Sequence, residues 1–221
     1  MAKELGERVQ DVLKSISLDS YESIRDLYDI DIQYPELQII YNEILQCITF
    51  GFCIAAITLT NHLLEQFLKK LLTYHDSKRE VKNTGEDFEI VNEIKRSAEK
   101  FRENTLGKNI ELAFNAGLIT SQEKNILNEM KDDFRNAYSH ADTGKLYKDE
   151  SAVIEEIRDP NIVVEGRSGP KSEELWMNLP FFEFLFIRKH AEQNCIPYIR
   201  KLITIILSST QRLKQNEEPE K

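Results

Sequence analysis

The residues best suited to chemistry lie in one short run, Arg135-Asn136-Ala137-Tyr138-Ser139-His140. Arginine supplies a permanent, forked cation that fits phosphate oxygens. Histidine normally titrates near neutral pH, so His140 can take and return a proton. A cation and a titrating base are the minimum set for cleaving RNA without a metal. The run therefore predicts a phosphate-handling site, with the polar Asn136 directly beside the arginine.

The helix that must position this run carries an apolar stripe at helical spacing. Its members are Leu127, Met130, Phe134, Ala137, Tyr138 and Ala141. At ~100° per residue, Arg135 lies to one side of the stripe and His140 to the other, while Asn136 and His140 are neighbours on the outward face. For the two to act together, either the helix end distorts or a twofold dimer completes the site. The alternative is an arginine and a histidine that serve solubility or the helix dipole.

The composition favours helices throughout. Only 8 Gly and 6 Pro occur in 221 residues, which disfavours a turn-rich all-β fold. We expect an all-α fold, a single helical bundle with a small irregular or β-hairpin insertion between its last helices. The expected helices cover about 4–17, a short stretch after Asp19 or Ser20, 35–74, 88–102, 108–116, 121–141 and 180–213.

Several residues predict where these helices begin and end. Pro35 suits a first helical turn, Leu106-Gly107 predicts a break, and Gly117 predicts a helix end. Thr120 followed by Glu123 forms a capping box for the helix that carries Arg135. Pro197 predicts a kink in the last helix.

The chain divides into one helical domain and two peripheral segments. We expect an N-terminal helical extension over 1–34, the helical domain over 35–213 and a disordered tail over 214–221. The domain contains an acidic insertion at about 145–172, in which 152–157 and 162–165 read as the strands of a hairpin.

One uncharged stretch, from Ile44 to Leu64, is as long as a membrane-spanning helix, which needs ~20 residues. Its polar residues and its acidic flanks, Glu43 and Glu65, are atypical of a span. We therefore expect a central buried helix and no membrane association. No secretory signal opens the chain, and a cytoplasmic location is expected.

The net charge of −9 argues against a nucleic-acid partner, because phosphate binding usually appears as a basic surface. The excess acid, however, falls in 1–36 and 149–174, each with a net charge of −5. The part that contains Arg135 and His140 is nearly neutral. RNA binding is thus compatible with the charge, and we expect it to be weak and salt-sensitive.

The remaining cysteines and histidines suggest no further chemistry. Cys47, Cys53 and Cys195 lie in apolar runs without CxxC spacing, which indicates buried free thiols rather than a zinc site. His62 is expected to be a packed histidine and His190 a structural one. No cofactor and no metal are expected, since no His, Asp or Glu pair has convincing ligand spacing and no glycine-rich phosphate loop occurs.

With these residues in hand, the chain resembles the HEPN domains, a helical fold common in prokaryotic defence and toxin–antitoxin proteins. Their motif is Arg, four to six residues, then His, often with Asn after the Arg, and Arg135-Asn136-x3-His140 fits it. The run from Ala55 to Leu71 looks like the family's long helix, which often carries one acidic residue facing the site, here Glu65. Leu106-Gly107-x2-Ile110-x-Leu112 looks like its short preceding element. The resemblance covers about 35–142, and the last long helix fits as a closing helix.

The resemblance implies metal-independent cleavage of single-stranded RNA in a homodimer. The protein would act as an anti-phage defence nuclease, or as a toxin with an antitoxin or regulatory partner. His140 would move the proton of the ribose 2′-hydroxyl or of the leaving oxygen, Arg135 would hold the phosphate and Asn136 would orient either group. Glu65 would fix Arg135 through an ion pair, and Tyr138 and Ser139 are supporting candidates. The alternative is a non-catalytic HEPN module that binds RNA, a nucleotide or a protein partner.

Overall fold

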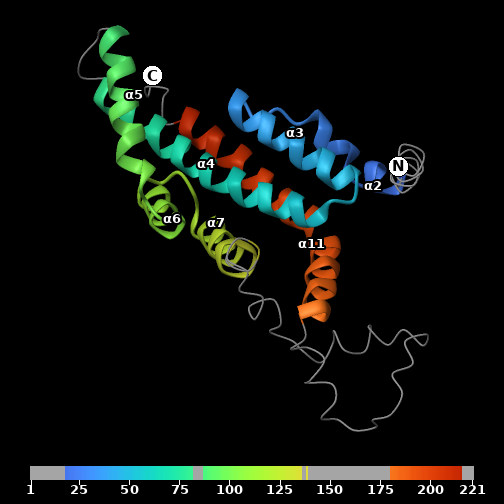
Figure 1. Ribbon diagram of the computed structural model, residues 1–221. Helices are drawn as coiled ribbons and strands as arrows, with labels where there is room; N and C mark the ends of the chain where they lie inside the picture. Colours follow the sequence, from blue (N-terminus) through green and yellow to red (C-terminus); the bar gives the residue numbers. More distant parts are fainter. Residues whose placement is uncertain (1–17, 82–86, 136–137, 139–179, 216–221) are drawn as a thin grey trace, which may run out of the picture.

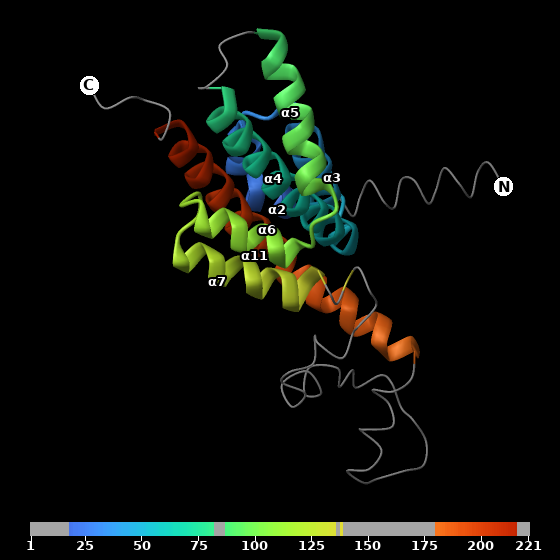
Figure 2. The same cartoon turned by 90° about the vertical axis from the view of Figure 1, so that its left-hand side faces the viewer.

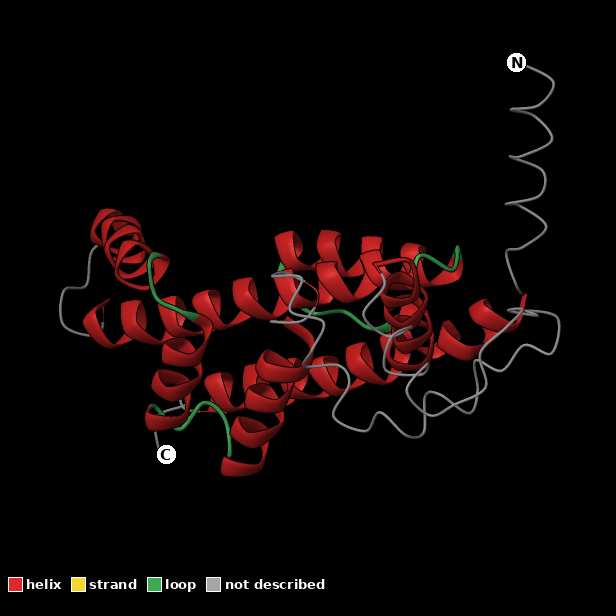
Figure 3. Ribbon diagram, turned by 60° about the horizontal axis from the view of Figure 1, so that its bottom comes forward, coloured by secondary structure: helices red, strands yellow, loops and turns green. Residues whose placement is uncertain are grey.

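Every regular element in the described part of the chain is a helix. The computed structural model describes residues 18–81, 87–135, 138 and 180–215, and in these it contains helices and loops only (Figures 1 and 3). The elements are α2 (Leu18–Ile24), η1 (Arg25–Asp29), α3 (Pro35–Thr49), α4 (Cys53–Val81), α5 (Asp87–Arg102), α6 (Leu106–Asn115), α7 (Ser121–Glu129), η2 (Met130–Arg135) and α11 (Pro180–Gln215). The all-α prediction is confirmed. The predicted hairpin at 152–165 lies outside the described residues, as does most of the predicted tail over 214–221. The first two residues of that tail, 214 and 215, are the last residues of α11.

The single helix predicted over 35–74 is wrong, because α3 and α4 are separate helices joined by a tight turn (Figure 1). Gly51 has a φ of 74°. Its N–H bonds to the Ile48 carbonyl at 3.0 Å, and the Phe52 N–H bonds to the Cys47 carbonyl at 2.7 Å. These two bonds form a Schellman motif, which ends a helix at a left-handed residue that glycine adopts without strain.

The apolar character of the sequence continues through this turn because both helices are buried. α3 buries one face, made of Leu37, Tyr41, Ile44, Leu45 and Ile48. The uncharged stretch from Ile44 to Leu64 is therefore the end of α3 and the start of α4, not one central helix. Among the described residues, no helix has the length and apolar character needed to cross a membrane.

Helix α4 lies at the centre of the bundle. It packs against α3, α5, α6, η2 and α11, and both α3 and α11 run along it (Figures 1 and 2). Its buried side chains include Leu63, Leu64, Phe67, Leu68 and Leu71, each with no exposed surface. Burial of apolar side chains of this size stabilises the fold by about 1.5–3 kcal/mol each, so α4 is a large source of hydrophobic stability.

The segment before α3 is part of this core. Ile24 and Ile32 have no exposed surface, and Leu27 is 2% exposed. The Arg200 guanidinium of α11 donates to both Asp26 carboxylate oxygens, at 2.6 and 2.7 Å. This ion pair connects the segment 18–34 to α11, the last helix of the chain that the structure describes.

Two helix boundaries before the Arg135 segment follow the expected signals, and one does not. Gly117, with a φ of 71°, closes a second Schellman motif after α6, as predicted. The capping box of Thr120 and Glu123 is present at the start of α7. Leu106 and Gly107 do not break a helix but begin α6, because the Thr105 hydroxyl caps it by accepting from the Lys108 N–H at 3.3 Å.

Helix α11 contains Pro197 in its interior, as the sequence predicts. Its two halves run in different directions in Figure 1. Proline lacks the N–H that would bond four residues back, which allows the helix to bend there. The second half of α11 follows α4, and the first half reaches towards the Arg135 segment.

Replacing Gly51 by alanine should lower the free energy of unfolding by about 1–2 kcal/mol, the cost of a left-handed L-residue. Nothing lies within 4 Å of the position a Cβ would take, so steric overlap adds nothing. The matched control is Gly107→Ala in α6, where an added Cβ would only touch the Lys131 side chain, 3.7 Å away. This control should gain about 0.5 kcal/mol. Urea denaturation of both variants measures the contrast, and equal effects at the two sites would contradict it.

Candidate functional site

The helix that carries Arg135 changes character in its second half. The capping box starts α7, whose N-terminal turn is also anchored to α11 by an ion pair between Glu123 and Arg212. Burial opposes ionisation of Glu123, but hydrogen bonds from Arg212 and Ser208 outweigh it and lower the pKa of its carboxyl. From Met130 to Arg135 the helix is a π-helix, η2. Over these six residues its wider turns replace the regular helix predicted from 121 to about Ala141. Such turns occur often at functional sites.

The inner face of this helix follows the predicted stripe. Leu127 and Met130 are buried. The Phe134 ring stacks on Tyr198 of α11, with 4.2 Å between the ring centroids. Ala137 and Ala141, the other small members of the stripe, lie outside the described residues. Phe134 therefore fixes the rotation of η2 against α11, and the neighbouring Arg135 is directed away from that contact towards α4.

Arg135 forms an ion pair with Glu65 of α4. The Arg135 Nε donates to the Glu65 Oε1 at 2.9 Å, and the two side chains are 30% and 29% exposed. The ion pair that the resemblance implied is thus present, across 70 residues of sequence. A partly exposed pair adds little to stability. Its main effect is to restrict the orientation of the planar guanidinium, which also carries donors at both terminal nitrogens.

Tyr138 joins the same region to α11 through His190. The Tyr138 hydroxyl oxygen lies 2.8 Å from His190 Nδ1 and 3.3 Å from the Ile187 carbonyl oxygen. The carbonyl can only accept, so when Tyr138 donates to it, His190 donates to the hydroxyl oxygen. The His190 ring also packs against Phe134, with 5.5 Å between the centroids. His190 is thus a packing residue, as expected, but its contact with Tyr138 has no signal in the sequence.

Burial lowers the pKa of His190, and the negative charge of Asp133 only partly opposes this effect. A neutral imidazole is consistent with its position between two aromatic rings. His190 therefore has one nitrogen committed to Tyr138 and a ring that favours the uncharged form.

The structure places only part of the predicted site. Asn136, Ser139 and His140 lie outside the described residues, so the base of the motif has no assigned position. Of the remaining candidates, Arg135 and Glu65 are brought together, and Tyr138 lies beside His190.

His62 departs from the sequence prediction. It is exposed rather than packed, because the buried face of α4 passes through its neighbours Asn61 and Leu63. Three residues before Glu65, His62 lies on an adjacent part of the helix surface. His62 was predicted to be packed in the core, but it is a surface histidine near the ion pair of Arg135 and Glu65.

The immediate surroundings of Arg135 are mixed in charge. Asp132 and Asp133 precede it in η2, and Lys131 contacts Asp132 at 3.5 Å. Within the described ranges, no group of three or more His, Cys, Asp or Glu side chains could hold a metal ion. What the arrangement offers is a cation held in place by a carboxylate, close to an aromatic and histidine cluster.

We expect His190 to titrate below the ordinary histidine value of 6.5. In the window between that value and the lowered pKa of the folded state, the unfolded chain binds more protons. The stability contributed by neutral His190 is therefore lost as the pH falls through this window. NMR titration of the imidazole resonances, assigned with a His190→Phe variant, measures the pKa directly. A His190 pKa at or above 6.5 would contradict the burial argument.

Comparison with known proteins identifies no relative of this chain. No family model, no curated protein and no solved structure matches the chain. The resemblance to HEPN domains therefore rests on the Arg135–His140 motif, on Glu65 and on the order of the helices.

Proposed function

We propose that this chain is a metal-independent endoribonuclease of the HEPN type, acting in anti-phage defence or as the toxin of a toxin–antitoxin pair. The observation that carries the proposal is the Arg135–Glu65 ion pair at a partly exposed position of a π-helix. A cation with a restricted orientation and access to solvent is what binding a scissile phosphate requires.

The proposed reaction uses the ribose 2′-hydroxyl as nucleophile. His140 takes the proton of this hydroxyl or protonates the leaving 5′-oxygen, and Asn136 orients the phosphate or His140. Arg135 offsets the charge that develops on the phosphate oxygens. The products carry a 2′,3′-cyclic phosphate and a 5′-hydroxyl, and DNA is inert because it lacks the nucleophile.

Glu65 acts on Arg135 and not on the substrate. Its carboxylate holds Nε at 2.9 Å, so the planar guanidinium is presented in a limited range of orientations. The same carboxylate reduces the local positive charge. This combination favours positioning over strong binding, which agrees with the expected weak and salt-sensitive affinity for RNA.

Tyr138 supports the site by anchoring the chain that follows Arg135. Its hydroxyl contacts His190 and the Ile187 carbonyl, and its ring stacks near Phe134. These contacts fix Tyr138 itself against the first half of α11. Ser139, next to Tyr138, remains a supporting candidate from sequence only.

The proposed active form is a homodimer. On a regular helix Arg135 and His140 flank the apolar stripe instead of sharing a face, and a twofold axis near the motif would bring two Arg/His sets together. The π-helix changes this geometry, because its turns hold more residues than those of an α-helix. A distorted helix end and a second copy are both compatible with the proposal.

A second candidate is a non-catalytic HEPN module that binds RNA, a nucleotide or a protein partner. It is favoured by the carboxylates around the cation: Glu65 is paired with Arg135, and Asp132 and Asp133 precede it in the same turn. Carboxylates compete with phosphate for a guanidinium and repel a polyanion. A neutralising antitoxin or regulatory protein would be the partner in either case.

Cleavage of labelled single-stranded RNA in EDTA tests the catalytic proposal. Wild-type protein should cut RNA but not DNA of the same sequence. Arg135→Ala and His140→Ala should each lower the rate of RNA cleavage ~100-fold or more. Lys131→Ala, which removes another cation from η2, is the matched control and should cut nearly as well as wild type. The cleavage rate of Glu65→Gln should lie between those of wild type and Arg135→Ala. This change keeps the shape of the side chain but removes the charge that orients Arg135.

Two results would reject catalysis. One is intact RNA with folded wild-type protein across pH and salt, and the other is equal cleavage by wild type and by both motif variants. Binding of RNA that depends on Arg135 without any cleavage would instead support the non-catalytic module.

Light scattering of the purified protein tests the dimer. We expect twice the monomer mass at micromolar concentration, since a composite site requires stable association. A monomer that cleaves RNA with unchanged rate on dilution would exclude a site shared between two copies.

A further inference from the structure

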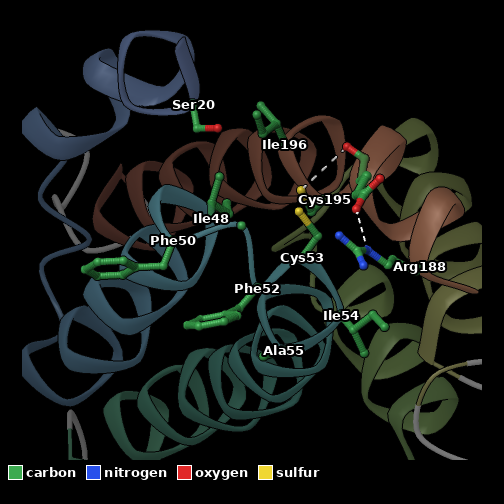
Figure 4. Close-up of a pocket in the computed structure, with 12 residues that line it drawn as sticks. Ser20, Ile48, Phe50, Phe52, Cys53, Ile54, Ala55, Arg188, Cys195 and Ile196 are labelled. Carbon is green, nitrogen blue, oxygen red and sulfur yellow. Dashed lines mark hydrogen bonds and ion pairs between the residues drawn. The ribbon is translucent and has the colours of Figure 1, made fainter. Parts of the chain in front are cut away.

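A pocket lies on a part of the bundle that does not include the ion pair of Arg135. This pocket of about 850 Å³ opens between the turn that joins α3 to α4 and the first half of α11. Phe50 and Phe52 flank it with partly exposed rings, and Arg188 borders it from α11 (Figure 4). Two of the three cysteines of the chain, Cys53 and Cys195, also line it.

These two cysteines come from distant parts of the sequence and meet in the pocket. Cys53 is the first residue of α4, and Cys195 lies in the middle of α11. Their thiols are close enough to influence each other's acidity, and Figure 4 shows the two sulfur atoms side by side. The Cys195 Sγ also lies 4.0 Å from the Glu192 carbonyl oxygen. Cys53 is half-buried, whereas Cys195 is 2% exposed. One thiol can therefore be reached from the pocket, and the other lies behind it.

The surroundings give the two thiols different acidities. The neighbouring Cys195 thiol lowers the pKa of Cys53, because it can donate to a Cys53 thiolate. Burial and the Glu192 carboxylate oppose this effect, and Arg188 assists it. The same interaction between the two thiols, together with burial, raises the pKa of Cys195. Cys53 is thus the better nucleophile, because the thiolate is the reactive form.

The proximity, the unequal access and the open pocket lead to one inference. We propose that Cys53 and Cys195 form a peroxide-reactive dithiol, in which Cys53 is oxidised first and Cys195 resolves it to an intramolecular disulfide. Redox-sensitive cysteines share this arrangement of an accessible thiolate next to a resolving thiol.

The reaction balances with hydrogen peroxide as the oxidant. The Cys53 thiolate attacks one peroxide oxygen, the O–O bond breaks, and the products are a sulfenic acid on Cys53 and hydroxide, which takes a proton to become water. The Cys195 sulfur then attacks the Cys53 sulfur, so an S–S bond forms as the S–O bond breaks. The departing hydroxide takes the thiol proton of Cys195 and leaves as a second water. Two electrons pass from the sulfurs to the peroxide.

The disulfide would connect the two helices that position the candidate RNA site. α4 carries Glu65, and α11 carries His190 and Tyr198. A covalent link between these helices restricts the unfolded chain and should raise the melting temperature of the oxidised protein. This proposal does not depend on the proposed nuclease activity, because its readout is the oxidation state of the thiols.

The test treats fully reduced wild-type protein with hydrogen peroxide, blocks the remaining thiols by alkylation and maps the peptides by mass spectrometry. We expect a Cys53–Cys195 linked peptide, a protein lighter by two hydrogen atoms before alkylation, and an alkylated Cys47. A thiol reductant should restore the original mass, and the oxidised form should melt at a higher temperature than the reduced one.

Variants separate the two roles. Cys195→Ser should leave Cys53 trapped as sulfenic or sulfinic acid, and Cys47→Ser is the matched control that should behave as wild type. The proposal is overturned by a disulfide that involves Cys47 or a second chain, or by peroxide treatment that leaves Cys53 and Cys195 unlinked. The wild-type mapping decides the matter alone if a variant does not fold.

Discussion

The burial of α4 is the constraint on which the other elements depend. It is covered by α3, α5, α6, η2 and α11, and one of its buried polar side chains, Asn61, is 3% exposed. The Tyr198 hydroxyl of α11 donates to the Asn61 carbonyl oxygen, which satisfies a buried acceptor that would otherwise cost about 1–3 kcal/mol. Phe134 stacks on the same Tyr198 ring. One hydrogen bond and one ring contact thus set α4, α11 and η2 relative to each other, and the candidate site is built on these three elements.

This arrangement explains why the candidate site is small and lies at an edge. A helix buried on most sides has few positions where a charged side chain can reach solvent, and Glu65 occupies one of them, just where η2 crosses α4. Arg135 is then held directly by the partly exposed Glu65 carboxylate, and its backbone is fixed by the stacking of the adjacent Phe134 on Tyr198. The carboxylate and the aromatic contact together do what neither could do alone, since the first fixes the guanidinium and the second fixes the backbone that carries it.

The helical class and most helix boundaries could be predicted because local signals decide them. Thr120 with Glu123 and the glycine at 117 act within one turn, and the Arg135–Glu65 pair followed from a resemblance that placed an acidic residue on the long helix. The break between α3 and α4 at Gly51 could not be predicted, because both helices are buried and the apolar sequence pattern continues from one to the other. Exposure of His62, the π-helix and the meeting of Cys53 with Cys195 depend on packing between distant segments, which no local spacing records.

A π-helix is equivalent to an α-helix into which one extra residue has been inserted. The chain between the Thr120 cap and Arg135 therefore contains more residues than a regular helix would need for the same rotation. At unchanged chain length, a uniform α-helix over 130–135 would rotate Arg135 away from Glu65, so the ion pair depends on the wide turns of η2. The direction of Arg135 is therefore set by the number of residues per turn in η2 as well as by the contacts of its side chain.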